Sequence, residues 1–84
     1  MTNEINESLH SFVEYLVKSL VDEPDTVQIN EVTAEHSTTY EVHVSPNDLG
    51  KVIGKQGRIA NALRTVTKAA AMKHKRKVYV EIVP

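Results

Sequence analysis

The 84-residue sequence contains no cysteine, and its aromatic residues are limited to one Phe and three Tyr. The absence of cysteine excludes disulfides and thiolate zinc sites. No apolar run approaches the ~18–20 residues of a membrane-spanning helix, and the acidic, polar N-terminus lacks the features of a secretory signal. We therefore expect a cytoplasmic protein that does not engage a membrane.

Catalytic and metal-binding motifs are equally scarce. The histidines at positions 10, 36, 43 and 74 show no metal-ligand spacing, and no motif pairs a nucleophile with a base. A chain of this length also leaves little room for an enclosed catalytic pocket. We expect no enzyme, no cofactor and no metal.

Charge is divided sharply along the chain. Residues 1–48 hold ten acidic residues against one basic residue, whereas residues 49–84 hold nine basic residues against one acidic residue. Such asymmetry indicates one surface for a polyanion and another turned away from it. Two solvated surfaces that merely attract each other are the alternative.

Apolar periodicity predicts three helices. Residues 4–21 form the first, with an apolar face made of Ile5, Leu9, Phe12, Val13, Leu16 and Leu20. A short helix over 49–53 is capped by Asn47 or Asp48. The third runs over 58–73, with Ile59, Leu63, Val66 and Ala70 on one face.

Alternating segments predict three strands. The first carries Val27 and Ile29, with Val32 following a register change, the second carries Tyr40, Val42 and Val44, and VYVEIV forms the last. The order is α-β-β-α-α-β. A strand–helix–helix–strand crossover joins parallel strands, and the hairpin before it is antiparallel. We expect one α+β domain over 1–84, with a mixed three-stranded sheet and helices on one face.

The stretch GKVIGKQGR, residues 50–58, contains every glycine of the chain. Gly54 and Gly57 flank Lys55 and Gln56 between two helices, where glycine permits positive φ and close approach of another backbone. The following helix N-terminus attracts phosphate. A sugar-phosphate backbone fits these features, although a plain hinge with solvated lysines is the alternative. The spacing does not match a nucleotide-binding P-loop, because only three residues separate Gly50 from Gly54.

The segment V-I-G-K-Q-G-R-I, residues 52–59, resembles the GXXG signature of KH domains, which clamp about four nucleotides of single-stranded nucleic acid. The element order is that of a type II KH domain, and the whole chain resembles the KhpA family of small bacterial RNA-binding proteins. This resemblance implies a groove bounded by the loop, its flanking helices and the second strand. Many KH domains carry a large aliphatic residue where this chain has Ala60, and we expect Ile59 to replace it.

The loop physics and the resemblance together predict an RNA-binding site. Its backbone clamp is the GXXG loop, with charge added by Lys51, Lys55 and Arg58, a groove shaped by Val52, Ile53 and Ile59, and a phosphate track extended by Arg64. The complete predicted set is Lys51, Val52, Ile53, Gly54, Lys55, Gln56, Gly57, Arg58, Ile59 and Arg64.

We therefore expect a single-stranded RNA-binding protein of low sequence specificity that acts as an RNA chaperone or post-transcriptional regulator. The alternative is a KH-like interaction subunit with little RNA binding of its own, and single-stranded DNA remains open as a ligand. The resemblance further implies a homodimer and pairing with a Jag/KhpB (EloR)-like protein.

Overall fold

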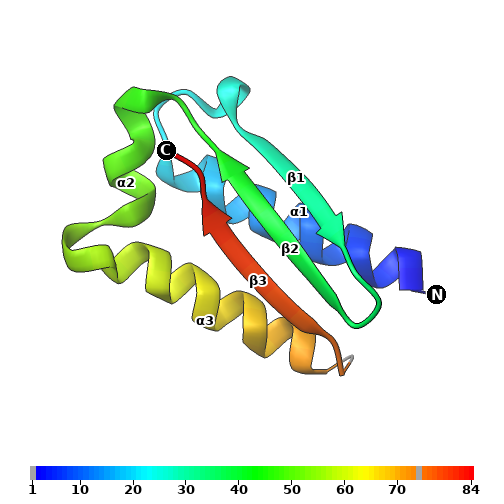
Figure 1. Ribbon diagram of the computed structural model, residues 1–84. Helices are drawn as coiled ribbons and strands as arrows, with labels where there is room; N and C mark the ends of the chain where they lie inside the picture. The colour runs from blue at the N-terminus through cyan, green and yellow to red at the C-terminus, as the bar shows by residue number, and fades with distance from the viewer. Residues whose placement is uncertain (1, 74) are drawn as a thin grey trace.

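The computed structural model describes residues 2–73 and 75–84, with side chains described from Ser8 onward in these ranges. The helices and strands are α1 (Thr2–Leu20), β1 (Gln28–Thr33), β2 (Ser37–His43), α2 (Leu49–Ile53), α3 (Arg58–Met72) and β3 (Lys77–Ile82) (Figure 1). Short 3-10 turns at Pro24–Thr26, Pro46–Asp48 and Lys55–Gly57 join them. Within the described ranges, no helix is both long and apolar enough to cross a membrane.

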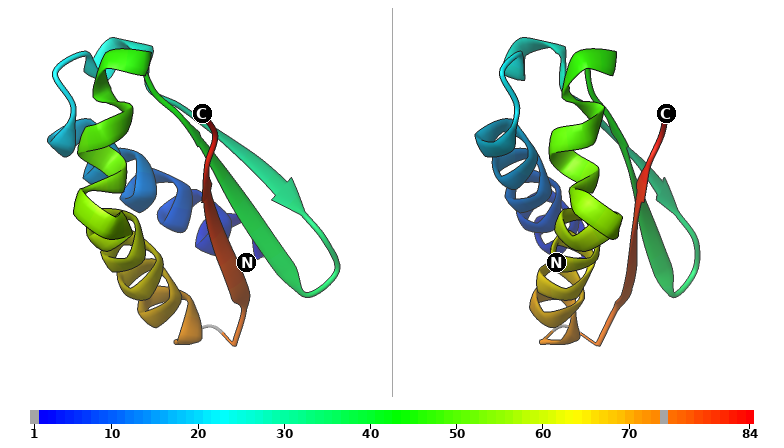
Figure 2. Two further views of the ribbon diagram at one scale, coloured as in Figure 1. Left: turned by 60° about the vertical axis from the view of Figure 1, so that its left-hand side comes forward. Right: turned by 90° about the vertical axis from the view of Figure 1, so that its left-hand side faces the viewer.

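The three strands form one sheet in the order β1-β2-β3. β1 pairs antiparallel with β2, and β2 pairs parallel with β3, so the predicted hairpin and crossover are both confirmed. The helices lie on one face of the sheet and leave the other face uncovered (Figure 2). This arrangement is the predicted α+β fold.

The core lies between the sheet and the three helices, and the buried stripe of α1 differs from the predicted one. Leu9 and Val13 are buried as expected, but the third member of the stripe is Val17, while Leu20 is 37% exposed. Residues four apart lie on one face of a helix, and Leu9, Val13 and Val17 form such a row toward the sheet. The predicted core side chain of Ile5 lies outside the described residues.

The predicted apolar face of α3 is confirmed only at Leu63. The buried residues of this helix are Ala60, Leu63, Thr67 and Ala71. Val66, predicted to be buried, is 46% exposed. Three of these four side chains, those of Ala60, Thr67 and Ala71, are small and let α3 lie close against its neighbours. Close packing therefore decides which face of α3 is buried more than the hydrophobicity of its side chains does.

The first strand contains no register change, contrary to expectation. β1 pairs with β2 residue by residue from Gln28↔His43 to Thr33↔Thr38. Successive side chains of an uninterrupted strand point to opposite faces of the sheet, so the side chain of Val32 points to the face opposite to that of Ile29. Val32 is accordingly 54% exposed, whereas Ile29 is buried.

Asp48 occupies the N-cap position of α2, but its side chain makes no bond to that helix. Its carboxylate is fully buried and accepts hydrogen bonds from the backbone N–H groups of Asp22, at 3.1 Å, and Glu23, at 3.0 Å. The Lys51 ammonium donates to the same carboxylate at 3.2 Å and to the Asp22 carboxylate at 2.6 Å. The segment after α1 is thereby fastened to the start of α2.

These contacts make stability depend on pH. Burial alone would raise the pKa of the Asp48 carboxyl, but the N–H groups of Asp22 and Glu23 and the Lys51 ammonium outweigh burial and lower it below its usual value. A carboxyl whose pKa is depressed by folding stabilises the protein above its unfolded pKa of about 3.9. That stabilisation is lost as the pH falls through the folded-state value.

We predict that Asp48→Asn melts about 5–10 °C below the wild type at pH 7, because the anionic acceptor is lost. The gap should narrow as the pH falls below about 4, because there the unfolded chain takes up a proton at Asp48 while the folded carboxyl, whose pKa is lowered, is protonated only at a lower pH. Thermal unfolding followed by circular dichroism from pH 2 to 8 measures both effects. Asp25→Asn, in an exposed turn, is the matched control. A gap that does not change with pH contradicts the assignment.

Candidate functional site

The loop between α2 and α3 has an unusual backbone. Gly54 (φ 75°, ψ 175°), Gln56 (φ 57°, ψ 26°) and Gly57 (φ 73°, ψ 16°) all have positive φ. The Gly54 conformation is nearly restricted to glycine, and left-handed Gln56 is a strained conformation for a residue with a side chain. Gly54 donates its N–H to the Gly50 carbonyl at 2.9 Å, which ends α2 abruptly.

Ile59 explains why Gly54 has no side chain. A Cβ at Gly54 would lie 2.6 Å from Cγ1 of Ile59, whereas a Cβ at Gly57 would meet no atom within 4 Å. Ile59 also lines a hollow between α1 and α3, so it supports the loop from the helix side. Its neighbour Ala60 is buried at 4% exposure.

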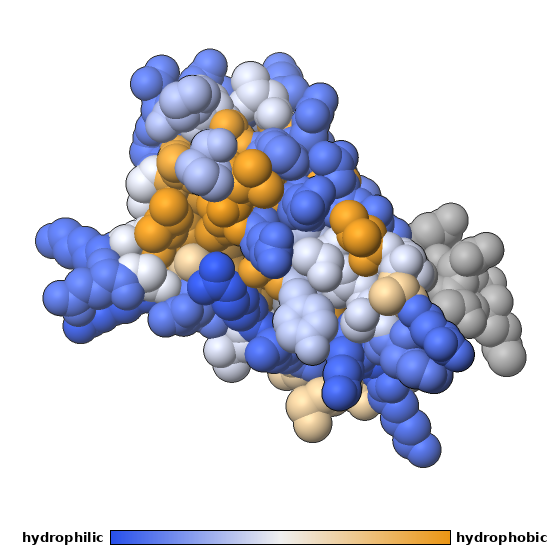
Figure 3. Space-filling model, viewed as in Figure 1, coloured by the Kyte–Doolittle hydropathy of each residue, from blue (hydrophilic) through white to orange (hydrophobic). Residues whose placement is uncertain are grey.

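The aliphatic pair before the loop is divided between core and surface. Val52 is completely buried and anchors α2, while Ile53 is 37% exposed. Leu49 and Ile82 are partly buried apolar neighbours of the core. Apolar side chains gather on the surface beside α2 and the C-terminal end of β3 (Figure 3). Val52 therefore shapes this surface from beneath, and Ile53 is available for direct contact.

The strand beside the loop helices is β3, which corrects the expected groove boundary. β2 is central and paired on both sides, so it has no free edge, whereas β3 is an edge strand next to α3. The Nε of Arg64 donates to the Val80 carbonyl at 3.1 Å, and its Nη1 donates to the Asn61 side chain at 3.1 Å. Arg64 thus bridges α3 and the free edge of β3.

The positive charges near the loop are not equivalent. Lys51 lies between two carboxylates. Its hydrogen bond to Asp22, and to a smaller extent its hydrogen bond to Asp48, raises the pKa of its ammonium. Lys55 and Arg58 are exposed, and no ion pair of either is found in the described part of the chain. The uncompensated charge therefore lies at the loop and at the first residue of α3.

Two partly buried apolar residues, Leu49 on α2 and Ile82 at the end of β3, were not among the predicted site residues. Leu49 lies four positions before Ile53 on the same short helix, and that spacing was a usable signal. Ile82 follows the inward-facing Val78 and Val80, so alternation alone assigns it to the core. It is nevertheless only partly buried, at the last position of β3.

A three-stranded mixed sheet, the α-β-β-α-α-β order and a GXXG loop between two helices define a type II KH domain. The family model described as "KhpA/KhpB, KH domain" matches residues 10–82. The chain belongs to this KhpA/KhpB family of KH domains.

Individual relatives agree with the family. "RNA-binding protein KhpA" of Clostridium perfringens is 59% identical over 75 residues, which cover 89% of this chain and 100% of that protein. The protein of the same name from Aquifex aeolicus is 47% identical over 75 residues, covering 89% and 95% of the two chains. A crystal structure of Aquifex aeolicus Era bound to GDP.AlF4- matches with a TM-score of 0.57 and 22% identity, covering 90% of this chain and 31% of Era, and it shows likeness of fold.

The loop geometry predicts that its glycines differ in importance. Gly54→Ala should lower the free energy of unfolding by about 2–4 kcal/mol, because a strained φ is added to a steric conflict with Ile59. In Gly57→Ala, the alanine takes a left-handed conformation but its Cβ meets no other atom, so the free energy of unfolding should fall by only about 1 kcal/mol. Urea denaturation of the two variants and the wild type makes the comparison. Equal losses, or a larger loss at Gly57, would contradict the packing assigned to Gly54.

Proposed function

We propose that this protein, as a single KH domain over residues 1–84, binds single-stranded RNA with low sequence specificity and acts as an RNA chaperone or post-transcriptional regulator. The observation that carries the proposal is the GXXG loop, where Lys55 and Arg58 are exposed and form no ion pair among the residues that the structure describes. The relatives named RNA-binding protein support it further.

The loop suits a phosphate for three physical reasons. Glycine at positions 54 and 57 lets a backbone approach without a Cβ in the way. The N–H of Arg58 donates to the Lys55 carbonyl, and the following N–H groups in the first turn of α3 have no carbonyl partners within the helix and attract anions. Lys55 and Arg58 add full positive charges at the same place. Beside this loop, Ile53, Leu49 and Ile82 offer an apolar surface on which bases can rest.

Lys51 contributes less to this proposal than the sequence suggested. Its ammonium is held by Asp22 and Asp48, so a phosphate would have to displace a carboxylate to bind it. Arg64 donates to the Val80 carbonyl and to Asn61, yet its side chain remains partly exposed at the edge of β3. We assign phosphate binding mainly to Lys55 and Arg58, with Arg64 as a secondary contact.

We predict that Lys55→Asp/Gln56→Asp binds a fluorescent single-stranded RNA at least tenfold more weakly than the wild type. The change keeps both glycines while placing two negative charges where a phosphate lies. Because a cationic contact is lost, the dependence of log affinity on log salt should become shallower by about 1. Fluorescence anisotropy at two or more salt concentrations measures both quantities.

The matched control is Lys18→Glu/Ser11→Glu, which makes the same change in net charge on α1. Both positions are exposed. Its affinity should stay close to the wild-type value. Equal weakening in the two variants would mean that only net charge matters, and unchanged binding in the loop variant would make the loop a hinge. If the folded wild type binds no RNA, the interaction-subunit alternative replaces this proposal.

We further propose that the protein forms a homodimer through the outer faces of α1 and α3, which lie in the layer covering the sheet (Figure 2). A hollow of about 270 Å³ opens there, lined by Leu16, Ser19, Leu20, Ile59, Ala62, Leu63 and Val66. Leu20 and Val66 leave apolar surface exposed, at 37% and 46%. A second copy suits this face because α1 belongs to the acidic half of the sequence and α3 to the basic half, so a twofold arrangement pairs opposite charges.

We predict that Val66→Glu weakens self-association at least tenfold, because a charge would be buried in an apolar contact. Val32→Glu, on the uncovered face of the sheet, is the matched control and should leave self-association unchanged. Sedimentation velocity over a wide concentration range measures both. A wild type that stays monomeric throughout would remove the homodimer, and the same face would then be tested against a KhpB-like protein.

A further inference from the structure

A second hollow lies at the opposite end of α3 from the glycine loop, against the beginning of β3. Its volume is about 300 Å³, at the lower end of small-molecule sites, and it is lined by Lys68, Met72, Arg76, Lys77, Val78 and Tyr79. Val78 is buried, while Tyr79 is 47% exposed and Met72 is 74% exposed. The hollow therefore combines an apolar floor with an aromatic ring that solvent can reach.

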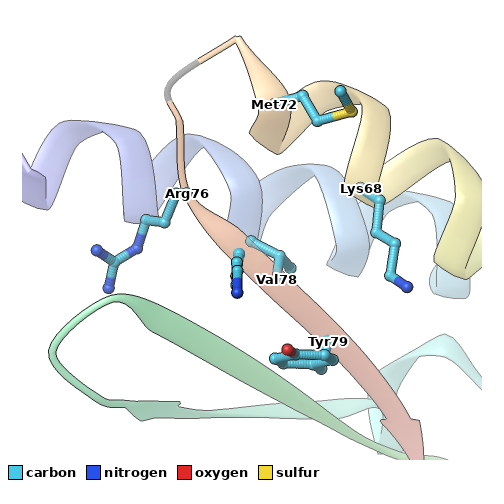
Figure 4. A pocket seen from close by; sticks show the side chains of 6 residues that line it. Lys68, Met72, Arg76, Val78 and Tyr79 are labelled. Atoms are coloured by element: carbon cyan, nitrogen blue, oxygen red, sulfur yellow. The ribbon is translucent and has the colours of Figure 1, made fainter.

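The cations around this hollow have different tasks. The guanidinium of Arg76 donates to the hydroxyl of the buried Thr38 at 2.8 and 3.1 Å, and it points toward the start of β2 (Figure 4). Lys68 extends from α3 toward the strand that carries Tyr79, and its ammonium lies 6.0 Å from the centre of that ring (Figure 4). Such a contact is weak at an exposed site, so Lys68 can leave the ring for a phosphate.

This hollow continues the line that starts at the glycine loop. Arg58, Asn61, Arg64, Lys68 and Met72 follow one another at three- and four-residue spacings, which place them along one side of α3. From Gly57 to Lys68 the helix rises about 17 Å. Arg64, bonded to the Val80 carbonyl, lies between the loop and the hollow. An RNA strand held at the glycine loop can therefore reach Tyr79 by following the line along which α3 lies beside β3.

We propose that this hollow is a base-stacking subsite for RNA, in which one nucleobase lies on the ring of Tyr79 beside Met72, and Lys68 contacts the adjoining phosphate. The proposal rests on the function proposed above and adds to it a contact beyond the roughly four nucleotides that a GXXG loop clamps. Any base can stack on the face of an aromatic ring, so the subsite should raise the affinity for longer RNA without selecting a sequence. Longer single strands should thus be preferred over short ones.

The test compares a four-nucleotide with an eight-nucleotide oligoadenylate, each labelled with fluorescein, by anisotropy. For the eight-nucleotide RNA, Tyr79→Leu should bind about tenfold more weakly than the wild type, because an apolar side chain replaces the stacking ring. Tyr79→Phe should retain the wild-type affinity. For the four-nucleotide RNA, all three proteins should agree within twofold. Lys68→Gln should show a smaller, salt-dependent loss confined to the longer RNA.

Tyr15→Leu is the matched control, because Tyr15 is an exposed tyrosine at 70% on α1. It should bind both RNAs as the wild type does. Tyr79→Trp adds a direct readout, since the chain has no tryptophan of its own. Its fluorescence should be quenched by the eight-nucleotide RNA and unaffected by the four-nucleotide RNA.

The outcomes separate this inference from the function on which it rests. If the wild type binds both RNAs and Tyr79→Leu matches it for the longer one, the subsite is wrong while the loop clamp stands. If Tyr79→Leu weakens both lengths equally, Tyr79 belongs to the primary groove or to the fold, which also overturns the subsite. If the folded wild type binds neither RNA, the proposed function itself fails. A selective loss for the longer RNA, with quenching of Trp at position 79, supports the subsite.

Discussion

The buried carboxylate of Asp48 holds together two parts of the fold that are 25 residues apart in sequence. It accepts hydrogen bonds from two backbone N–H groups in the segment after α1 and from the Lys51 ammonium of α2, so the buried charge is surrounded by donors. A buried carboxylate without such partners would be costly. The cluster fixes where α2 begins, and α2 in turn fixes the glycine loop. The same cluster pairs Lys51 with carboxylates, whereas Lys55 and Arg58 at the loop are exposed and form no ion pair among the described residues.

The loop itself depends on a close approach between a glycine and an isoleucine. Because Ile59 lies against Gly54, the chain turns from α2 into α3 within a few residues and presents the first turn of α3 to solvent. Ile59 also faces the hollow between α1 and α3. The loop proposed to bind RNA and the face proposed for self-association therefore share one side chain, Ile59, and occupation of one can influence the geometry of the other through it.

Sequence patterns located most of the elements and the loop, and their failures have common causes. Helical periodicity identified α1 and α3 and part of their buried faces, including Leu9, Val13 and Leu63, but it missed the buried Val17, Thr67 and Ala71. Val32 looked like a core residue, although an uninterrupted β1 turns it outward. Tyr79 was one ring among four scattered ones. Only the packing of α3 against β3 brings Lys68 and Met72 into the same hollow as Tyr79.

By itself, the sequence determined the element order, the parallel crossover, the division of charge and the glycine spacing of the loop. These are local properties, set by backbone preference and by periodicity along the chain. The tertiary structure decided which charges stay free, since Lys51 is neutralised by carboxylates from outside its own helix. It also decided that β3 rather than β2 is the strand beside the loop helices. Both depend on which distant segments meet, because burial and pairing act between residues that the chain order separates.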